Sequence, residues 1–274
     1  MAWFSPDPLY LPRMLDLNAD ARASQDALWF EESRWTWSEL VDACRRWAGA
    51  LGALGLAPGD RVGVVMENSR ETLVTLLGSL YGGFVAVPIN TAVTEDAAIG
   101  MLNDSNAKVV VCNDRHSRRL ESRIVSELEL VARVSVEDNL GWQRFDDLMS
   151  AATPRSSAAP VKGNDECNII YSSGTTGLPK GIVHDHRCRA AWAYDMAVAL
   201  HYHPSANTLC TLGLYSNITW VAMLATVLAG GTLHVMRRFD VDFTFDYIAE
   251  HKISHTTMVP VQLQRMLQSD RLES

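Results

Sequence analysis

The first regular pattern of apolar and polar positions lies between residues 36 and 55. Thr36 and Glu39 have the spacing of a capping box, in which each side chain accepts a hydrogen bond from the other's backbone N–H at a helix start. Apolar residues then return every three or four positions, at Leu40, Cys44, Trp47, Leu51 and Leu54. Gly55 ends the run. The pattern predicts one amphipathic helix.

Short apolar runs alternate with helical patterns along the rest of the chain. Strands are predicted at residues 62–66, 84–87, 108–112, 131–136, 168–171 and 254–258. Helices are predicted after Asn68 or Ser69, after Thr94, around residues 120–128, and at residues 243–251 and 261–268. Strands that alternate with helices build βαβ units with parallel strands. We therefore expect an α/β fold of mainly parallel sheets flanked by helices.

A boundary is predicted near residue 163. Residues 150–163 are small, polar and interrupted by prolines, which is typical of a surface connection. We expect a first α/β subdomain over residues 1–163 and a second, incomplete one over residues 164–274.

Charge and cysteine content exclude some classes of function. Lys and Arg number 24 against 32 Asp and Glu, a formal net charge of -8, so a basic face for nucleic acid is not expected. Five cysteines without CxxC spacing indicate reduced thiols in a cytoplasmic protein. Residues 72–94 and 196–236 lack Asp, Glu, Lys and Arg, but glycine, proline, histidine and asparagine divide them. Buried helices and strands are expected there, with no transmembrane segment.

The most informative segment is the loop at residues 172–181, SSGTTGLPKG, which follows a predicted strand. Glycines let the backbone approach an anion, hydroxyls donate hydrogen bonds, and Lys180 adds a positive charge, so the loop is predicted to bind a polyphosphate. It is not a Walker A loop, because Pro179 precedes the lysine and Gly181 replaces the Ser or Thr that would bind magnesium. A solvated linker is the alternative, which the apolar residues on both sides disfavour.

This loop resembles the signature YTSGTTGxPKG of the adenylate-forming enzymes, with Ser172 where many members have Thr. That superfamily includes acyl-CoA synthetases, luciferases and the adenylation domains of peptide synthetases. Weaker similarities lie at residues 35–40, 57–62, 183–186, 228–232 and 259–260. Among them, Asp185 stands in a Thr position and His186 matches the family's His. The chain resembles the N-terminal part of an acyl-CoA synthetase.

The resemblance implies a reaction and a set of site residues. A carboxylic acid and ATP would form acyl-AMP and pyrophosphate, and a thiol, usually that of coenzyme A, would then displace AMP. Magnesium is expected near Ser172, and catalytic roles are expected for Lys180 and His186. Phosphate contacts are expected from Ser172, Ser173, Gly174, Thr175, Thr176, Gly177 and Lys180. The acyl pocket is expected at Tyr215, Ser216, Asn217 and Trp220.

The substrate class follows from the absence of charge in residues 212–220. An amino group would have no charged partner in this segment, so a fatty or aromatic acid is expected. Histidines suggest a metal site as an alternative, because strand alternation would place His184 and His186 on one face near Cys188. No cysteine pair or carboxylate cluster completes that set, so zinc is not expected.

The family's later motifs have no counterpart before Ser274. The missing parts are the Y-G-x-T-E and S-T-G-D segments and the C-terminal domain with its catalytic lysine. The chain alone is therefore expected to form acyl-AMP poorly. Two alternatives remain open: a non-catalytic nucleotide- or acyl-binding module, and an adenylation domain that loads a carrier-protein thiol. The sequence also leaves the oligomeric state open, a homodimer included.

Overall fold

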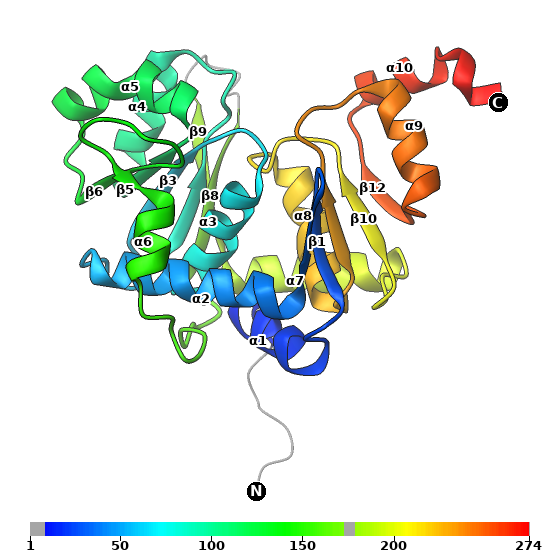
Figure 1. Cartoon of the computed structure of the whole chain (residues 1–274), viewed down its shortest axis with the longest axis horizontal. Coiled ribbons are helices and arrows are strands. Elements are labelled where there is room, and N and C mark those ends of the chain that lie inside the picture. The colour runs from blue at the N-terminus through cyan, green and yellow to red at the C-terminus, as the bar shows by residue number, and fades with distance from the viewer. Residues whose placement is uncertain (1–8, 173–178, 274) are drawn as a thin grey trace, which may run out of the picture.

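The structure, a computed structural model, describes residues 9–172 and 179–273. These residues form a seven-stranded and a five-stranded β-sheet, with helices packed between and around them (Figure 1). Most neighbouring strands are parallel, so the expected α/β class is confirmed.

The seven-stranded sheet has the order β7-β6-β5-β3-β4-β8-β9. Its strands are β3 (Arg61–Val65), β4 (Val85–Pro88), β5 (Ala107–Cys112), β6 (Ala132–Ser135), β7 (Gln143–Arg144), β8 (Glu166–Ser172) and β9 (Lys180–Asp185). The central strands are short, valine-rich and buried, as is usual for parallel sheets covered on both faces. Only the pair β8–β9 is antiparallel among the described strands of this sheet.

The five-stranded sheet has the order β12-β10-β11-β1-β2. Its strands are β1 (Asp26–Phe30), β2 (Ser33–Thr36), β10 (Asn207–Cys210), β11 (Thr232–Val235) and β12 (His255–Thr257). The early strand β1 lies parallel to the late strand β11, and β2 folds back antiparallel on β1. Strands of the two sheets therefore come from both sides of residue 163, and sheet membership does not follow the predicted subdomain boundary.

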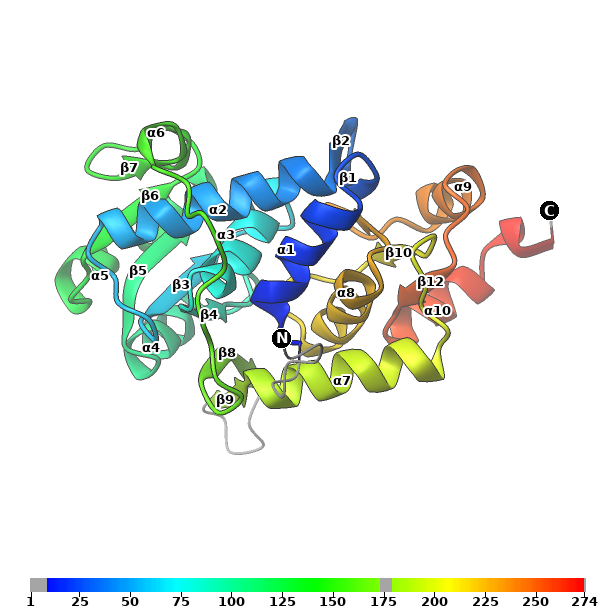
Figure 2. The ribbon, with the colours of Figure 1, turned by 90° about the horizontal axis from the view of Figure 1, so that it is seen from below.

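Helices join the two sheets. Five helices pack together in one connected group: α1 (Leu11–Ala21), α2 (Trp37–Ala53), α3 (Arg70–Tyr81), α7 (His186–Ala199) and α8 (Asn217–Ala229). From below, α1 lies between α2 and α8, and α7 runs alongside α8 (Figure 2). The remaining helices are α4 (Glu95–Asp104), α5 (Asp114–Glu127), α6 (Phe145–Ala151), α9 (Val241–Glu250), α10 (Pro260–Leu267) and a 3-10 turn (Asp270–Glu273).

The predicted start of α2 is confirmed. The hydroxyl of Thr36 accepts from the backbone N–H of Glu39 at 3.3 Å, and the Glu39 carboxylate accepts from the N–H of Thr36 at 2.7 Å. Ser69 caps α3 by accepting from the N–H of Thr72 at 3.1 Å. Asn68, the alternative cap, makes longer-range contacts instead.

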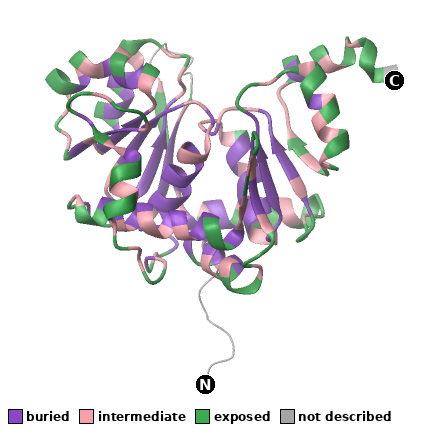
Figure 3. Ribbon diagram, viewed as in Figure 1, coloured by how far each residue is buried: buried purple, intermediate pink, exposed green. Residues whose placement is uncertain are grey.

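One hydrophobic core continues from sheet to sheet (Figure 3). Leu28 and Leu233 of the five-stranded sheet share this core with Val62 and Val109 of the seven-stranded sheet. Residues 72–89 are buried throughout, as expected for the first stretch without charges. Within the described residues, no helix is long and apolar enough to cross a membrane.

The connection near residue 160 is fastened to the helices. Asp16 of α1 accepts hydrogen bonds from the Tyr81 hydroxyl at 2.6 Å, Arg45 at 2.8 Å and the backbone N–H of Ala158 at 3.0 Å. Burial raises the pKa of Asp16, but these three donors outweigh it and hold the pKa below its ordinary value. The N–H of Ala159 also donates to the Tyr81 carbonyl. The predicted surface connection thus takes part in the packing of α1, α2 and α3.

Candidate functional site

The Ser/Thr/Gly loop joins two antiparallel strands. Ser172 at the end of β8 pairs in register with Lys180 at the start of β9. The predicted phosphate contacts Ser173, Gly174, Thr175, Thr176 and Gly177 lie outside the described residues. A Walker A loop leads from a strand into a helix whose N-terminus faces the phosphates. This loop leads from a strand into a strand, so any phosphate affinity depends on loop donors and Lys180.

A cavity of about 480 Å³ lies beside the described ends of this loop. That volume falls in the usual range of small-molecule sites. Its wall consists of Pro88, Asn90, Val93, Met101, Ile170, Tyr171, Ser172, Pro179, Ile182, His184, Tyr215, Ser216 and Asn217. The structure therefore brings Ser172 together with the predicted acyl-pocket residues 215–217.

Asn68 holds the segment that supplies those residues. Its side-chain amide donates to the carbonyls of Leu212 at 3.0 Å and Met236 at 2.8 Å, and its carbonyl accepts from the N–H of Leu214 at 2.8 Å. Asn68 follows β3 of one sheet, whereas these partners follow β10 and β11 of the other. The side chain therefore links the two sheets next to the cavity, a role that local sequence did not reveal.

The fourth predicted acyl-pocket residue lies one layer behind the wall. Trp220 is fully buried, and its Nε1 donates to the carbonyl of Leu214 at 2.9 Å. It is absent from the cavity lining, whereas Tyr215, Ser216 and Asn217 belong to it.

His184 and His186 do not share a strand face. Strand β9 ends at Asp185, which caps α7 by accepting from the N–H of Cys188 at 2.7 Å. His186 is therefore the first residue of a helix, with its ring 6.1 Å from the ring of Tyr10, while His184 lines the cavity. Among the described residues, no group of three His, Cys, Asp or Glu gathers as a metal site.

Both imidazoles are buried. Burial, and for His184 also the neighbouring charge of Arg189, lower the pKa of each ring to about 4. The neutral form is therefore the one present at pH 7. Neither ring nitrogen of His186 has a hydrogen-bond partner among the described residues.

Arg189 of α7 lies directly behind the cavity wall. Its Nε donates to the side-chain carbonyl of Asn168 at 2.8 Å, and its Nη1 donates to that of Asn217 at 2.9 Å. Its Nη2 lies 3.4 Å from Nδ1 of His184. Sequence analysis missed this residue, because nothing in its neighbourhood along the chain marks it as buried.

A second hollow, of about 410 Å³, adjoins the first through Tyr215. The buried His116 lies 3.0 Å from the carboxylate of Glu67 at its wall. Arg115, Arg237 and Arg238 also line it. Polar and basic groups thus surround the space beyond Tyr215.

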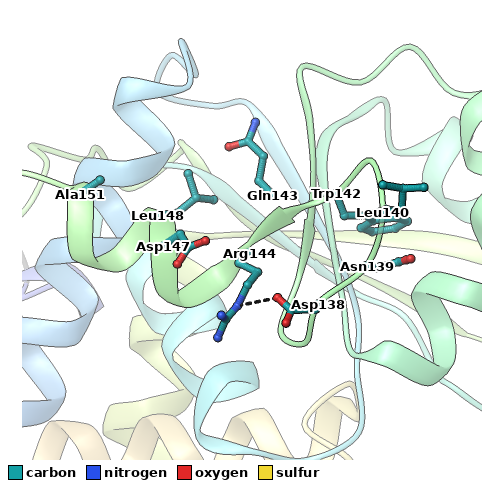
Figure 4. Close-up of a pocket in the computed structure, with 9 residues that line it drawn as sticks. All are labelled: Asp138, Asn139, Leu140, Trp142, Gln143, Arg144, Asp147, Leu148 and Ala151. Carbon is teal, nitrogen blue, oxygen red and sulfur yellow. Dashed lines mark ion pairs between the residues drawn. The ribbon is translucent and has the colours of Figure 1, made fainter.

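A larger hollow lies elsewhere among the described residues. It measures about 700 Å³ and is formed by residues 138–151, around the edge strand β7 (Figure 4). Its wall holds an ion pair between Arg144 and Asp138 at 3.2 Å and the almost fully exposed Leu140. None of the predicted site residues lines it, so size alone does not locate the site.

Comparison with known proteins shows the family of the chain. A family model described as AMP-binding enzyme matches residues 15–274. A long-chain-fatty-acid–CoA ligase of Mycobacterium tuberculosis is 30% identical over 235 residues, which are 86% of this chain and 46% of that protein. Tyrocidine synthase 2 of Brevibacillus parabrevis is 30% identical over 251 residues, 88% of this chain and 6% of the synthase.

A solved structure shows the same fold. The inhibitor-bound N-terminal domain of FACL13 from Mycobacterium tuberculosis superposes with a TM-score of 0.85 at 28% identity, over 97% of this chain and 66% of that one. The chain spans about half the length of the acyl-CoA ligases that it matches. The family match covers nearly the whole chain, and the chain therefore belongs to the AMP-binding family of adenylate-forming enzymes.

Proposed function

We propose that this chain is the part of an acyl-CoA synthetase that binds ATP and a carboxylic acid for the formation of acyl-AMP and pyrophosphate. In the second step, the thiol of coenzyme A would displace AMP. One observation carries the proposal: the ends of the Ser/Thr/Gly loop and residues 215–217 border a single cavity. Phosphates and an acyl group could meet there.

The loop supplies the phosphate contacts in this proposal. Hydroxyl and backbone donors of Ser172, Ser173, Gly174, Thr175, Thr176 and Gly177, with the ammonium of Lys180, offset negative charge on the pyrophosphate as it departs. Adenylation makes the acid reactive, because AMP leaves a carbonyl carbon far more readily than oxide does. The thiol can then attack that carbon.

Magnesium could bind at this cavity together with the phosphates of ATP. Mg²⁺ is commonly held by one or two protein oxygens together with substrate phosphates, so a closed protein cage is not needed. The Ser172 hydroxyl, at the cavity wall, is the protein oxygen we assign to it. The ion would neutralise phosphate charge.

Apolar residues give the cavity room for a fatty or aromatic chain. Val93, Met101, Ile170 and Ile182 line it beside Tyr215, and no Asp or Glu belongs to the described lining. A substrate ammonium group would therefore have no counter-charge in this wall. Trp220 supports the wall from behind, through the Leu214 carbonyl.

The histidine at the cavity wall is His184. We assign it the contact to reactants that the family resemblance suggested for His186, because His186 is buried away from the described lining. A neutral imidazole can donate one hydrogen bond and accept another, which suits contact with a phosphate or carboxylate oxygen.

A carrier-protein thiol is the second candidate acceptor. The 30% identity to tyrocidine synthase 2 favours it, since that match covers 88% of this chain. Only the second step differs between the two candidates. Mixing the loaded protein with coenzyme A or with a phosphopantetheinylated carrier would separate them.

The adenylation proposal is tested by binding of a stable acyl-AMP mimic. We expect dodecanoyl- or benzoyl-sulfamoyl adenosine to bind the chain more tightly than ATP in calorimetric titrations, since it joins both halves of the cavity. Ser172→Ala should weaken both, while Ser205→Ala, at an exposed turn, should weaken neither. Absence of binding by both ATP and the mimics would refute the proposal.

A further inference from the structure

A buried cation without a carboxylate partner lies behind the wall of the cavity. Arg189 is 1% exposed, and its guanidinium carbon lies 5.2 Å from the ring centres of both Trp192 and Trp220. Its hydrogen-bond partners are Asn168, Asn217 and His184. Buried arginines are rare unless they are paired with an acid, and among the described residues no acid pairs with this one.

The guanidinium keeps its charge at pH 7. Burial lowers the pKa of Arg189 to about 10, which leaves the protonated form dominant. The two indole faces offset part of the cost of removing the ion from water. They do not neutralise it, so the positive potential extends to the groups that Arg189 contacts.

These contacts decide which atoms face the ligand. A guanidinium has donors only, so Asn217 must turn its Oδ1 toward Arg189, and its Nδ2 donor remains for the cavity. By the same reasoning, Nδ1 of His184 accepts from Arg189, and the proton of the neutral ring lies on Nε2. Both residues line the cavity. Its wall therefore presents the N–H donor of Asn217 beside the ring of His184, which also hydrogen-bonds to the backbone of Ile182.

We propose that Arg189 is a positioning residue that makes this wall a receptor for an anionic oxygen ligand, a phosphate or a carboxylate group. It orients the side chains of Asn217 and His184 and adds a positive charge that the ligand neutralises. The proposal rests on the proposed function and refines it. Residues 212–220 have no charge of their own, but α7 supplies one from behind.

Asn217→Asp tests the idea with little change of shape. A carboxylate at this position would form an ion pair with Arg189 and neutralise its charge. Its second oxygen would face the cavity as a hydrogen-bond acceptor in place of the amide donor. We expect an unchanged or raised melting temperature together with affinities for ATP, pyrophosphate, benzoate or dodecanoate weakened on the order of tenfold or more. If Arg189 were purely structural, Arg189→Met would leave ligand affinity unchanged.

Two further variants and a control complete the experiment. Arg189→Met should weaken binding of the same anions, and Arg189→Lys, which keeps the charge but loses the planar fork, should weaken it less. Arg187→Met removes an exposed arginine from the same helix and should leave affinities unchanged. Each affinity comes from calorimetric titration, and each fold is checked by thermal unfolding.

The outcomes separate the ligand sources and the two proposals. If these variants weaken the binding of ATP and pyrophosphate, the wall near Asn217 contacts phosphate. If they weaken only the binding of benzoate and dodecanoate, it contacts the carboxylate. If the unaltered chain binds these ligands and Asn217→Asp binds them equally well, the inference about Arg189 is overturned alone. If the unaltered chain binds none of them, the proposed function fails, and the inference fails with it.

Discussion

Lys180→Ala should separate phosphate binding from folding. Lys180 is the first residue of β9, its backbone pairs with Ser172, and its side chain is exposed. The side chain makes no hydrogen bond or ion pair with the described residues. Exposed substitutions of this kind change stability by no more than about 0.5 kcal/mol, so the melting temperature should hardly move.

The effect on ATP binding should be much larger. Two unit charges about 4 Å apart interact by roughly 4 kcal/mol at the effective dielectric constant of a protein surface. Loss of hydration and screening reduce this value, and hydrogen bonds to charged groups contribute about 1.5–3 kcal/mol. The affinity for ATP should therefore fall roughly 10- to 150-fold.

Calorimetric titration with ATP measures the affinity, and scanning calorimetry measures the melting temperature. Lys162→Ala is the matched control, because Lys162 is also exposed but lies outside the Ser/Thr/Gly loop that Lys180 follows. In the protein that carries out both steps, Lys180→Ala should slow adenylation more than thiol transfer. Unchanged ATP affinity, or equal slowing of both steps, would refute the phosphate role.

Two other substitutions test the contacts that hold the site in place. Asp16→Asn should lower the free energy of unfolding by about 2 kcal/mol at pH 7, because three donors lose a charged acceptor. Since the folded-state pKa is lowered, the difference should be complete above about pH 4 and shrink below it, in urea titrations at several pH values. Asn68→Ala should cost about 3 kcal/mol, because three buried backbone groups lose their partner, and should also weaken ATP binding. Lower stability with unchanged ATP affinity would show that residues 212–217 are held by other contacts.

Local patterns predicted the elements better than their assembly. The start of α2 could be predicted from Thr36 and Glu39, which lie within one helical turn. The buried strands β3, β4 and β5 could be predicted from their short apolar runs, whereas β1, β2, β10 and β11 were not predicted. Sheet membership needed contacts between distant segments. Leu28 pairs with Leu233, and no local pattern carries that information. The boundary at residue 163 was inferred from composition, whereas the sheets exchange strands across it.

The same contrast explains the site. The loop could be located because its glycines, hydroxyls and lysine lie together in the sequence. The histidines depended on where β9 ends. Strand β9 ends at Asp185, which caps α7. His186 therefore lies in the helix and, contrary to the prediction from strand alternation, does not share a strand face with His184. Arg189 and Asn68 could not be found, since their roles arise from partners in other elements.

Ligands of open α/β sheets usually bind at the carboxyl ends of parallel strands. Here the cavity wall takes Asn90 from beyond β4, Ser172 from the end of β8, and Asn217 from beyond β10. Two of these strands belong to one sheet and the third to the other. Neither sheet alone could form the wall, so the contacts of Asn68 between the sheets and of Arg189 between β8 and α8 determine its geometry. The shape of the cavity therefore depends on how the sheets are joined as well as on the residues that line it.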